Sequence, residues 1–367
     1  MTRSLESIDW HAFLARPRLP SPSPQSLDAL RNKPILVTGA GGSIGSALAL
    51  RLAALAPSQL ILLEASESHL YALQRTWSDA GVAAPVTFIL GSVTDNALLD
   101  EIFAVHVPRI VFHAAAFKHV PLMEQQPLAA IANNVFGTHA LVSAASARSA
   151  RVVLLSTDKA VEPASIMGAT KRVAEHIVLA ARGTVLRLGN VLASRDSVAE
   201  VFAHQIAHGG PITVTDPAAR RYFLTLDEAA GLLLAAASGP ELPALLAPAL
   251  LAPHFIADLA RFMACELAAG PTIPIEFTHP RPGDKEVEDL FSSAESAQPA
   301  HSTSLLRIHS QLLGHNQLHC ALTALRAALD ARDLAAALAA LRALVPGYAP
   351  GAALLVLAGK SSQRVSL

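Results

Sequence analysis

The sequence predicts an α/β fold: a doubly wound parallel sheet with a smaller C-terminal lobe. Two observations support this prediction. Short apolar, β-branched runs alternate with helical patterns as far as about residue 190, which is typical of consecutive βαβ units. The first run leads directly into a glycine-rich turn and then an alanine- and leucine-rich stretch. We expect an N-terminal segment at 1–30, a Rossmann domain at 31–190, a C-terminal lobe sharing Rossmann elements at 191–350, and a tail at 351–367.

The composition argues against several classes of protein. The 367 residues carry a formal net charge of −1, which disfavours nucleic-acid binding. The two cysteines form no disulfide framework, and the histidines show no zinc-binding spacing, so we expect no metal. The most apolar stretch, 229–252, is interrupted by prolines, a glycine and a glutamate, so we expect no membrane insertion. Residues 1–18 do not resemble a signal peptide, and we expect a cytoplasmic protein.

The first strand, 34–37, runs into a Gly-x-x-Gly-x-x-Gly turn. Gly39 allows the tight turn, Gly42 the close approach of a pyrophosphate, and Gly45 the packing of helix on strand. Ser43 and Ile44 open the following helix, whose N-terminus would hold the phosphates. Because the glycines stand between a strand and a helix, they predict a dinucleotide-binding site.

The next three strands, 59–63, 87–90 and 109–112, each end beside this predicted site. Glu64 ends the second strand, where an acidic side chain would bind the adenosine ribose hydroxyls. No cation follows within the next few residues, which favours NAD over NADP. After the other two strands come the remaining residues that we expect to bind the cofactor: Ser92 and Val93 at the adenine edge, and the small residues Ala114, Ala115 and Ala116.

The fifth strand, 151–155, delivers a hydroxyl, a carboxylate and an amine in consecutive positions. These are Thr157, Asp158 and Lys159, which are followed by a helix running from about Met167 to Gly183. Met167 and Lys171 lie four residues apart and therefore share a face of that helix. Ligands of open α/β sheets bind at the carboxyl ends of the strands, so this group predicts a catalytic site.

Several motifs closely resemble the bacterial polysaccharide-biosynthesis branch of the extended short-chain dehydrogenase/reductase family, the UDP-N-acetylglucosamine 4,6-dehydratases. The resemblance covers nearly the whole chain. It rests on the motifs at 112–124, 133–138, 156–161, 167–172, 187–192, 209–215, 221–223, 281–285 and 344–350.

This resemblance implies a mechanism. NAD⁺ takes hydride from C4 of the sugar, water leaves across C5–C6, and the hydride returns to C6 to give a 4-keto-6-deoxy sugar. Lys159 would remove the C5 proton, Asp158 would protonate the departing C6 hydroxyl, and Thr157 would hydrogen-bond the C4 oxygen. Lys171 would hold the nicotinamide ribose and supply positive charge. We expect burial and that charge to lower the pKa of Lys159, and an apolar setting to keep Asp158 protonated.

Met167 occupies the position where most short-chain dehydrogenases have a tyrosine base, and larger members of this branch resemble the chain in having methionine there. The base for the C4 hydroxyl is then Asp158, a water held by Thr157, or Lys159.

The resemblance also implies contacts with a UDP-sugar. The residues expected to make them are Lys118, His119, Asn190, Arg221 and Arg281. Three departures from the family pattern stand out: Ser92 replaces an aspartate, Asp196 replaces a glycine, and 240–252 lack the family's strand that ends in an acidic-glycine turn.

The amphipathic helical stretch 317–344 predicts packing or an oligomer contact, and we expect a homo-oligomer. Two other functions fit the same motifs. A nucleotide-sugar epimerase acting at C4 or C5 would use the C4 oxidation alone, and a regulator would bind NAD without catalysis. The adjacent Asp158 and Lys159 favour the dehydratase.

Overall fold

The structure is a computed structural model that describes residues 5–250, 252–267 and 273–364. Its centre is a nine-stranded sheet in the order β14-β15-β11-β6-β5-β4-β1-β2-β3. Seven strands are parallel, and their bounds are β1 Pro34–Thr38, β2 Gln59–Glu64, β3 Val86–Leu90, β4 Ile110–His113, β5 Arg151–Thr157, β6 Thr184–Leu188 and β11 Ala244–Pro248. β15 (Leu305–His309) and β14 (Ser296–Pro299) add an antiparallel edge. The predicted doubly wound parallel sheet is confirmed.

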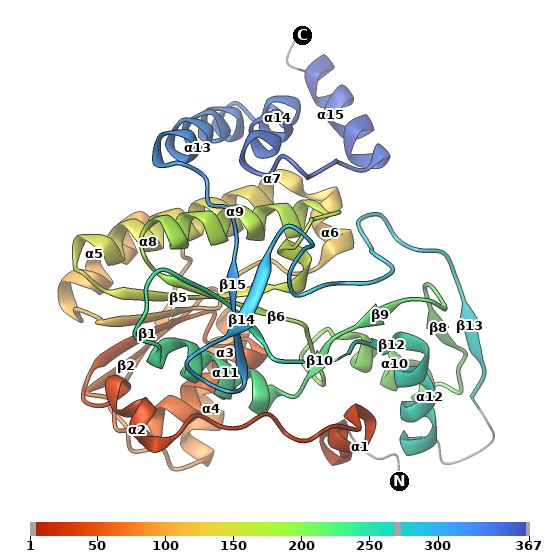
Figure 1. The fold of residues 1–367 in the computed structure, drawn as a ribbon, viewed down its shortest axis with the longest axis horizontal. Coiled ribbons are helices and arrows are strands. Elements are labelled where there is room, and N and C mark those ends of the chain that lie inside the picture. The colour runs from red at the N-terminus through yellow and green to blue at the C-terminus, as the bar shows by residue number, and fades with distance from the viewer. Residues whose placement is uncertain (1–4, 251, 268–272, 365–367) are drawn as a thin grey trace.

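Helices cover both faces of the sheet (Figure 1). One face carries α2 (Pro24–Leu27), α3 (Ser43–Ala53), α4 (Glu67–Asp79) and α11 (Leu226–Ser238). The other carries α5 (Asn96–Val105), α8 (Thr138–Ala147) and α9 (Ile166–Ala180). The central strands β1, β2, β4 and β6 are buried on both sides, which explains why they read as continuous apolar runs.

The C-terminal stretch forms a second helical layer over α9. It contains α13 (His315–Asp330), α14 (Leu334–Leu344) and α15 (Ala352–Arg364) (Figure 1). The chain turns between α13 and α14 at Arg332, which has a φ of 55°, and Asp333 caps α14 by accepting a hydrogen bond from the backbone of Ala336. The leucines of the predicted amphipathic face pack into the core beside α9, so packing within the chain accounts for this stretch.

The smaller lobe combines segments from distant parts of the sequence. Its helices are α10 (Val198–Ala207) and α12 (Ile256–Leu267), and its short strands are β7 (Asn190–Val191), β8 (Ile212–Val214), β9 (Arg220–Arg221), β10 (Phe223–Leu224), β12 (His254–Phe255) and β13 (Ile275–Phe277). The N-terminal elements η1 (Leu5–Ser7) and α1 (Trp10–Leu14) complete the apolar core of the lobe, because Ile8, Phe13 and Leu14 are buried in it. The N-terminal segment is therefore divided: its described part up to Leu14 packs in the lobe, whereas Leu27 and Leu30 pack against the central sheet.

One expectation about the sheet was wrong. The stretch 240–252 does contain a strand, β11, which pairs in parallel with β6 and is buried throughout. No acidic-glycine turn follows this strand, but its run of alanines and leucines is apolar enough to form a buried strand beside β6. The chain also places α11 of the apolar stretch 229–252 in the core rather than at the surface.

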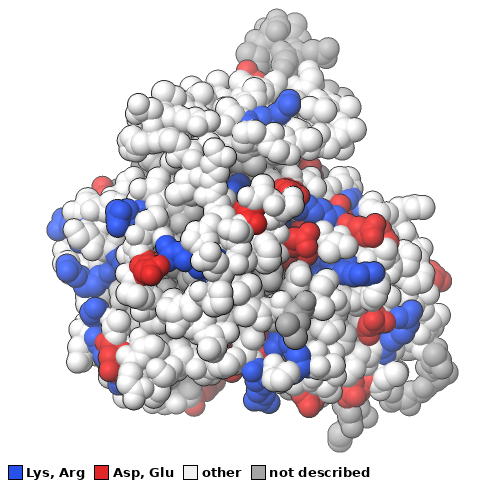
Figure 2. All heavy atoms as spheres, in the orientation of Figure 1, with Lys and Arg blue, Asp and Glu red and all other residues white. Residues whose placement is uncertain are grey.

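Helix α6 (Val120–Gln125) and a continuous helical stretch follow β4: α7 (Pro127–Ala130), the π-helical η3 (Ile131–Gly137) and α8. Among the described helices, this stretch, Pro127–Ala147, has the length and apolar composition of a membrane span, but 56% of its apolar segment is buried inside the fold. Acidic and basic side chains are interspersed over the visible face of the molecule (Figure 2). This mixture agrees with the near-zero net charge.

Candidate active site

The glycine-rich turn lies where β1 meets α3, as predicted. Gly39 has a φ of 65°, and a Cβ atom there would stand 2.7 Å from the backbone nitrogen of Ala115. A Cβ at Gly45 would collide with the carbonyl oxygen of Gly39. Gly42 is the N-cap of α3, and no side chain caps that end of the helix. The turn thus leaves an open backbone cradle at a helix N-terminus, which fits the pyrophosphate of a dinucleotide.

Glu64 lies at the end of β2 and supports this cradle. Its Oε2 accepts a hydrogen bond of 2.9 Å from the backbone N–H of Gly41, and its Oε1 accepts one of 2.9 Å from Ser66. The side chain is buried. Each carboxylate oxygen has a second lone pair, so Glu64 can accept bonds from ribose hydroxyls while it holds the turn.

The other residues predicted to bind the cofactor differ in how close they lie to the cradle and in how exposed they are. Ala114, Ala115 and Ala116 follow β4, and the backbone of Ala114 and Ala115 lies directly against Gly39. Ser92 is partly exposed, and its hydroxyl forms a 2.8 Å hydrogen bond with that of Thr94. Val93 is only 4% exposed and lies in the core close to Gly137, so its side chain is not open to a ligand, and its predicted cofactor contact stays a prediction.

Arg195 was missed by the sequence analysis and lies against the cradle. Its guanidinium donates a 2.6 Å hydrogen bond to the carbonyl oxygen of Gly41, and its backbone N–H donates one of 2.8 Å to Ser43 Oγ. The loop that follows β7 is therefore fastened to the turn that precedes α3. The consecutive positions Ser194, Arg195 and Asp196 gave no local signal of this contact, because the two segments are far apart in the sequence.

The second part of the site lies at the carboxyl end of β5. Lys159 Nζ donates hydrogen bonds to Asp158 Oδ1 at 3.0 Å and to Asn190 Oδ1 at 3.1 Å. Thr157 Oγ1 donates to the same Asp158 oxygen at 2.9 Å. The structure therefore brings together the three consecutive residues predicted as catalytic and one residue predicted to bind substrate.

The surroundings of Asp158 differ from the apolar setting that we expected. Asp158 is fully buried, but it shares one oxygen with an ammonium and a hydroxyl. The side chain of Lys159 is 22% exposed, so the amine is the member of this pair that faces outward. Asp158 Oδ2 has no hydrogen-bond partner among the described residues.

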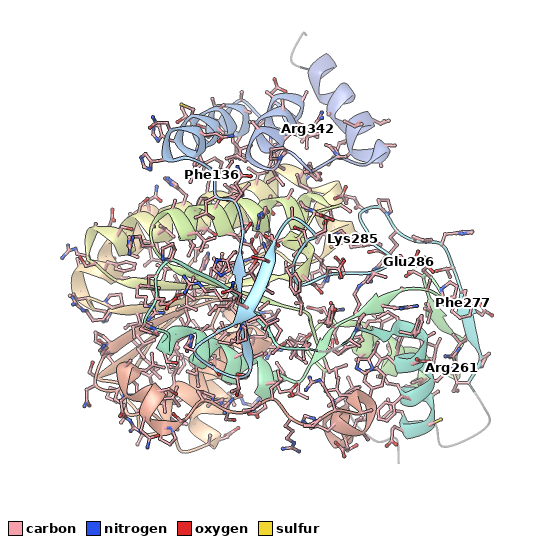
Figure 3. All side chains as sticks on the ribbon, viewed as in Figure 1. Phe136, Arg261, Phe277, Lys285, Glu286 and Arg342 are labelled. Carbon is pink, nitrogen blue, oxygen red and sulfur yellow. The ribbon has the colours of Figure 1, made fainter. Side chains whose placement is uncertain are left out.

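Glu288 is a second carboxyl at this site, and the sequence analysis missed it. Its Oε1 lies 4.0 Å from Lys159 Nζ, and its Oε2 lies 3.5 Å from Lys285 Nζ. Glu288 is buried, and that burial raises the pKa of its carboxyl, with Lys159 opposing the shift and Asp158 adding to it. Figure 3 shows the neighbouring Lys285 and Glu286 on the segment that connects the lobe to β14.

We call Asp158, Lys159, Asn190 and Glu288 the acid–base cluster. The first turn of α9 lies against this cluster, and Ser165 caps that helix by accepting a hydrogen bond from the backbone N–H of Gly168. A Cβ at Gly168 would collide with the carbonyl oxygen of Lys159, so only glycine allows this close approach.

Met167 and Lys171 are both buried on α9. Lys171 Nζ donates a 2.8 Å hydrogen bond to the carbonyl oxygen of Leu155, and burial lowers the pKa of Lys171 to about 8, although Glu175 opposes this shift. Burial and then the charge of Lys171 lower the pKa of His113 to about 3. His113 is therefore neutral and bridges the hydroxyls of Thr38 and Thr138.

The residues predicted to bind the sugar nucleotide differ in their positions. Arg281 is exposed and pairs with Asp284 at 2.9 Å. Arg221 is buried, and its guanidinium donates to the backbone oxygens of Lys285 and Glu286, at 2.8 and 3.0 Å. Arg221 thus holds the segment that carries Glu288, and its contact with a UDP-sugar stays a prediction.

Lys118 and His119 lie beside the loop that contains Arg195. Lys118 Nζ donates to the carbonyl oxygen of Arg195, and His119 Nε2 lies 3.7 Å from Asp196 Oδ2. Asp196 has a φ of 55°, a left-handed conformation in which glycine is favoured and aspartate is tolerated. This explains how aspartate replaces the family glycine: its backbone fits, and its side chain is 66% exposed.

A Rossmann sheet, a glycine cradle and a Thr-Asp-Lys group at the end of β5 define the chain as a member of the extended short-chain dehydrogenase/reductase class. Comparisons with known proteins agree. The sequence model of the family described as "Polysaccharide biosynthesis protein" matches residues 35–310. The chain belongs to this family.

Two relatives illustrate the range of the family. The chain is 39% identical over 277 residues to the probable polysaccharide biosynthesis protein EpsC of Bacillus subtilis, covering 72% of this chain and 46% of EpsC. The chain thus spans about half the length of that relative. It is 34% identical over 284 residues to a UDP-glucose 4-epimerase of Rickettsia canadensis, covering 73% of this chain and 80% of that protein.

Solved structures share the fold. Pen from Bacillus thuringiensis superposes with a TM-score of 0.71 at 28% identity, over 77% of this chain and 89% of Pen. DesIV, a dTDP-glucose 4,6-dehydratase from Streptomyces venezuelae solved with NAD bound, superposes with a TM-score of 0.60 at 19% identity, over 70% of this chain and 88% of that one. At that identity DesIV supports the fold alone.

Proposed function

We propose that the protein is an NAD-dependent nucleotide-sugar 4,6-dehydratase that acts on UDP-N-acetylglucosamine or a related UDP-N-acetylhexosamine in polysaccharide biosynthesis. The observation that carries the proposal is the contact of Lys159 Nζ with Asp158 Oδ1 and Asn190 Oδ1 at the carboxyl end of β5. Elimination of water across C5–C6 needs a base for the C5 proton and an acid for the C6 hydroxyl, whereas oxidation at C4 alone needs only a base for the C4 hydroxyl. A partly exposed amine held against a buried carboxyl supplies such a pair.

The cradle at Gly39, Gly42 and Gly45 would hold the cofactor's pyrophosphate, and Glu64 its adenosine ribose. A nicotinamide held there would supply the hydride chemistry, oxidation at C4 and reduction at C6 of the sugar. Lys171 would orient the nicotinamide ribose from α9, where its amine already lies against the carbonyl of Leu155.

The proton transfers would use different groups. Thr157 is partly exposed and its Oγ1 donates to Asp158 Oδ1, so a C4 hydroxyl that donates to Thr157 can pass its proton on to Asp158. This route favours Asp158, acting through Thr157, as the C4 base and makes a tyrosine at position 167 unnecessary. Lys159 would remove the C5 proton, because its side chain is 22% exposed whereas Asp158 and Glu288 are buried. Asp158, protonated by the C4 hydroxyl, would then give its proton to the departing C6 hydroxyl, so that water leaves.

A second candidate is a UDP-sugar 4-epimerase, which the Rickettsia relative favours by its name. Such an enzyme would oxidise and re-reduce C4 and would retain the C6 hydroxyl. Lys159 would then have no proton to take from C5.

Incubation of the purified protein with UDP-N-acetylglucosamine in D₂O, followed by mass spectrometry and proton NMR, tests the proposal. We expect loss of one water molecule and deuterium at C5. A C4 or C5 epimer formed without water loss would make the protein an epimerase. Bound NAD without turnover of any UDP-N-acetylhexosamine or of UDP-glucose would contradict both enzymes and favour a regulator.

Lys159→Ala should reduce dehydration by about a thousandfold, the effect typical of removing an acid–base group. Lys33→Ala is the matched control, because Lys33 is an exposed lysine just before β1. Retention of full dehydration by Lys159→Ala would remove Lys159 from the mechanism.

A further inference from the structure

Two carboxyls, Asp158 and Glu288, lie near the single amine of Lys159. Asp158 comes from the same turn as Lys159, but Glu288 arrives on a distant segment, 285–290, that connects the lobe to the sheet edge. Both carboxyls are buried, and neither Asp158 Oδ2 nor Glu288 Oε2 accepts a hydrogen bond among the described residues. Glu288 Oε2 does lie 3.5 Å from the ammonium of Lys285, whereas Oε1 lies 4.0 Å from that of Lys159. A carboxyl oxygen that accepts no hydrogen bond can carry a proton.

The segment that carries Glu288 is fixed by two arginines. Arg221 donates to the backbone oxygens of Lys285 and Glu286, and Arg187, which is fully buried, donates to that of Leu290 at 3.2 Å. Glu288 lies between these two anchors. Two buried arginines therefore hold the segment that places the Glu288 carboxyl next to Lys159.

Glu288 faces charged groups from three elements. Lys159 and Asp158 lie at the end of β5, Arg221 lies on β9, and Lys285 lies on its own segment. Lys285 is also held by a 2.6 Å hydrogen bond to the carbonyl oxygen of Val161. The net charge of the cluster is the same whether a given proton resides on Lys159 or on Glu288. Burial favours the neutral pair over the ion pair.

We propose that Glu288 is a positioning residue that takes the proton of Lys159 before the sugar reacts, so that the amine enters the reaction neutral. This inference rests on the proposed role of Lys159 as the C5 base. In the transfer, an N–H bond of the ammonium breaks, an O–H bond forms on Glu288, and the ion pair becomes a neutral pair. No other reactant is needed, and the proton stays available to the cluster when the amine is protonated by the sugar.

The consequence is an unusual dependence on pH. A lone lysine must lose its proton to solvent, so below its pKa the neutral fraction falls about tenfold for each pH unit. A lysine that shares one proton with a carboxyl keeps a constant neutral fraction over the whole range in which the pair holds one proton.

Competitive acylation of the NAD-bound protein with acetic anhydride between pH 6 and 9, read at the Lys159 peptide by mass spectrometry, measures this fraction without any turnover. We expect a nearly flat rate for the wild type over the lower part of this range. In Glu288→Gln the rate should fall about tenfold per pH unit there. Glu288→Asp keeps a carboxyl and should restore part of the flat region.

Glu286→Gln is the matched control, because Glu286 is exposed on the same segment and contributes its backbone oxygen to Arg221. Parallel labelling profiles in the wild type and Glu288→Gln, with bound NAD retained in both, would overturn the inference. Loss of the flat labelling profile in Glu286→Gln as well as in Glu288→Gln would also overturn the inference.

The dehydration assay is run on the same variants and separates the inference from the proposed function. Absence of dehydration in a wild type with a flat labelling profile would refute the function and leave the shared proton supported. If the wild type is active and Glu288→Gln lowers the dehydration rate by the same factor at every pH, Glu288 has a merely structural role.

Discussion

The cofactor cradle and the acid–base cluster are built in different ways, although both lie at the carboxyl edge of the same sheet. The cradle is made mainly of backbone, from the turn after β1 and the residues after β4, and the carboxylate of Glu64 at the end of β2 holds that turn. The cluster is made of side chains from the end of β5, from β7 and from the segment 285–290. The cradle thus depends on glycines that allow close backbone approach, whereas the cluster depends on side chains from distant segments that buried charged residues hold in place.

This difference predicts separate responses to mutation. A change behind the cluster should lower stability and catalysis and leave the cradle's geometry intact. A change in the cradle should lower cofactor binding and leave the protonation of Lys159 intact. The four changes below test this separation.

The largest effect is expected behind the cluster. Arg187 is fully buried on β6 and makes ion pairs of 2.9 Å with Glu175 and 2.8 Å with Glu295. Arg187→Met would leave two buried carboxylates without their main partner, which costs about 3 to 5 kcal/mol of unfolding free energy. Urea denaturation measures this loss.

Arg172→Met is the control, because Arg172 pairs with the same two glutamates from the edge of the network and is 16% exposed. Its loss should be clearly smaller. Equal losses of unfolding free energy in the two variants would mean that the burial of Arg187 does not determine its contribution to stability. We also expect Arg187→Met to change Lys159 labelling, because Arg187 anchors Leu290 beside Glu288.

Lys171 is buried on α9, and it should make the free energy of unfolding depend on pH. Its folded pKa is about 8, lowered by burial, whereas an unfolded lysine has a pKa of about 10.4. Between these values the unfolded chain binds more protons, so the stability should rise with pH from about 8 to about 10. The rise attributable to Lys171 is roughly 3 kcal/mol.

Lys171→Met should remove this rise, whereas Lys33→Met, at an exposed lysine, should retain it. Urea denaturation of the cofactor-free variants at pH 7.5 and 10 makes the comparison. A wild-type difference between these pH values that persists in Lys171→Met would show that Lys171 is already charged at little expense in the folded protein.

The same contrast explains what the sequence could predict. The cradle was predicted residue by residue, because Gly39, Gly42 and Gly45 form one contiguous motif between a strand and a helix. The strands were predicted because parallel strands buried on both faces are apolar throughout. The run Thr157-Asp158-Lys159 was found for the same reason: it directly follows a buried strand.

The missed residues depend on contacts between distant segments. Glu288 lies in the run Glu286-Val287-Glu288-Asp289, where no local pattern distinguishes the buried acid from the exposed ones. Arg221 was expected to contact the UDP-sugar, and no sequence pattern indicated that it also donates to the backbone oxygens of Lys285 and Glu286. Only the tertiary fold decides which of these charged side chains are buried and what they pair with.

Gly39→Ala tests the close approach that defines the cradle. Gly39 has a φ of 65°, and a Cβ atom on it would stand 2.7 Å from a backbone neighbour, whereas Gly81 has a φ of 60° and open space around it. Gly81→Ala should therefore cost about 1 kcal/mol for its backbone conformation alone. Gly39→Ala should cost roughly 1 to 3 kcal/mol more, from overpacking, and should weaken NAD retention.

Urea denaturation and gel filtration with bound NAD measure both consequences. Equal costs at the two glycines would show that the contact with Ala115 relaxes freely. The labelling profile of Lys159 should stay unchanged in both variants, because neither glycine lies in the acid–base cluster.

The smallest effect concerns Arg195, which fastens the loop after β7 to the cradle. Its guanidinium and backbone N–H bond Gly41 and Ser43 on the turn that would hold the pyrophosphate. Arg195→Ala removes the guanidinium contact and keeps the backbone one, so NAD should dissociate about tenfold faster, equivalent to about 1.4 kcal/mol. Arg75→Ala, at an exposed position on α4, is the control.

NAD dissociation followed by fluorescence in a stopped-flow instrument gives the rate. Because Asn190 precedes this loop on β7 and bonds Lys159, the loop connects the two regions. If Arg195→Ala accelerates dissociation and leaves Lys159 labelling unchanged, the loop acts on the cradle alone. If both change, the cradle and the acid–base cluster are coupled through β7, and cofactor binding helps to set the protonation of the base.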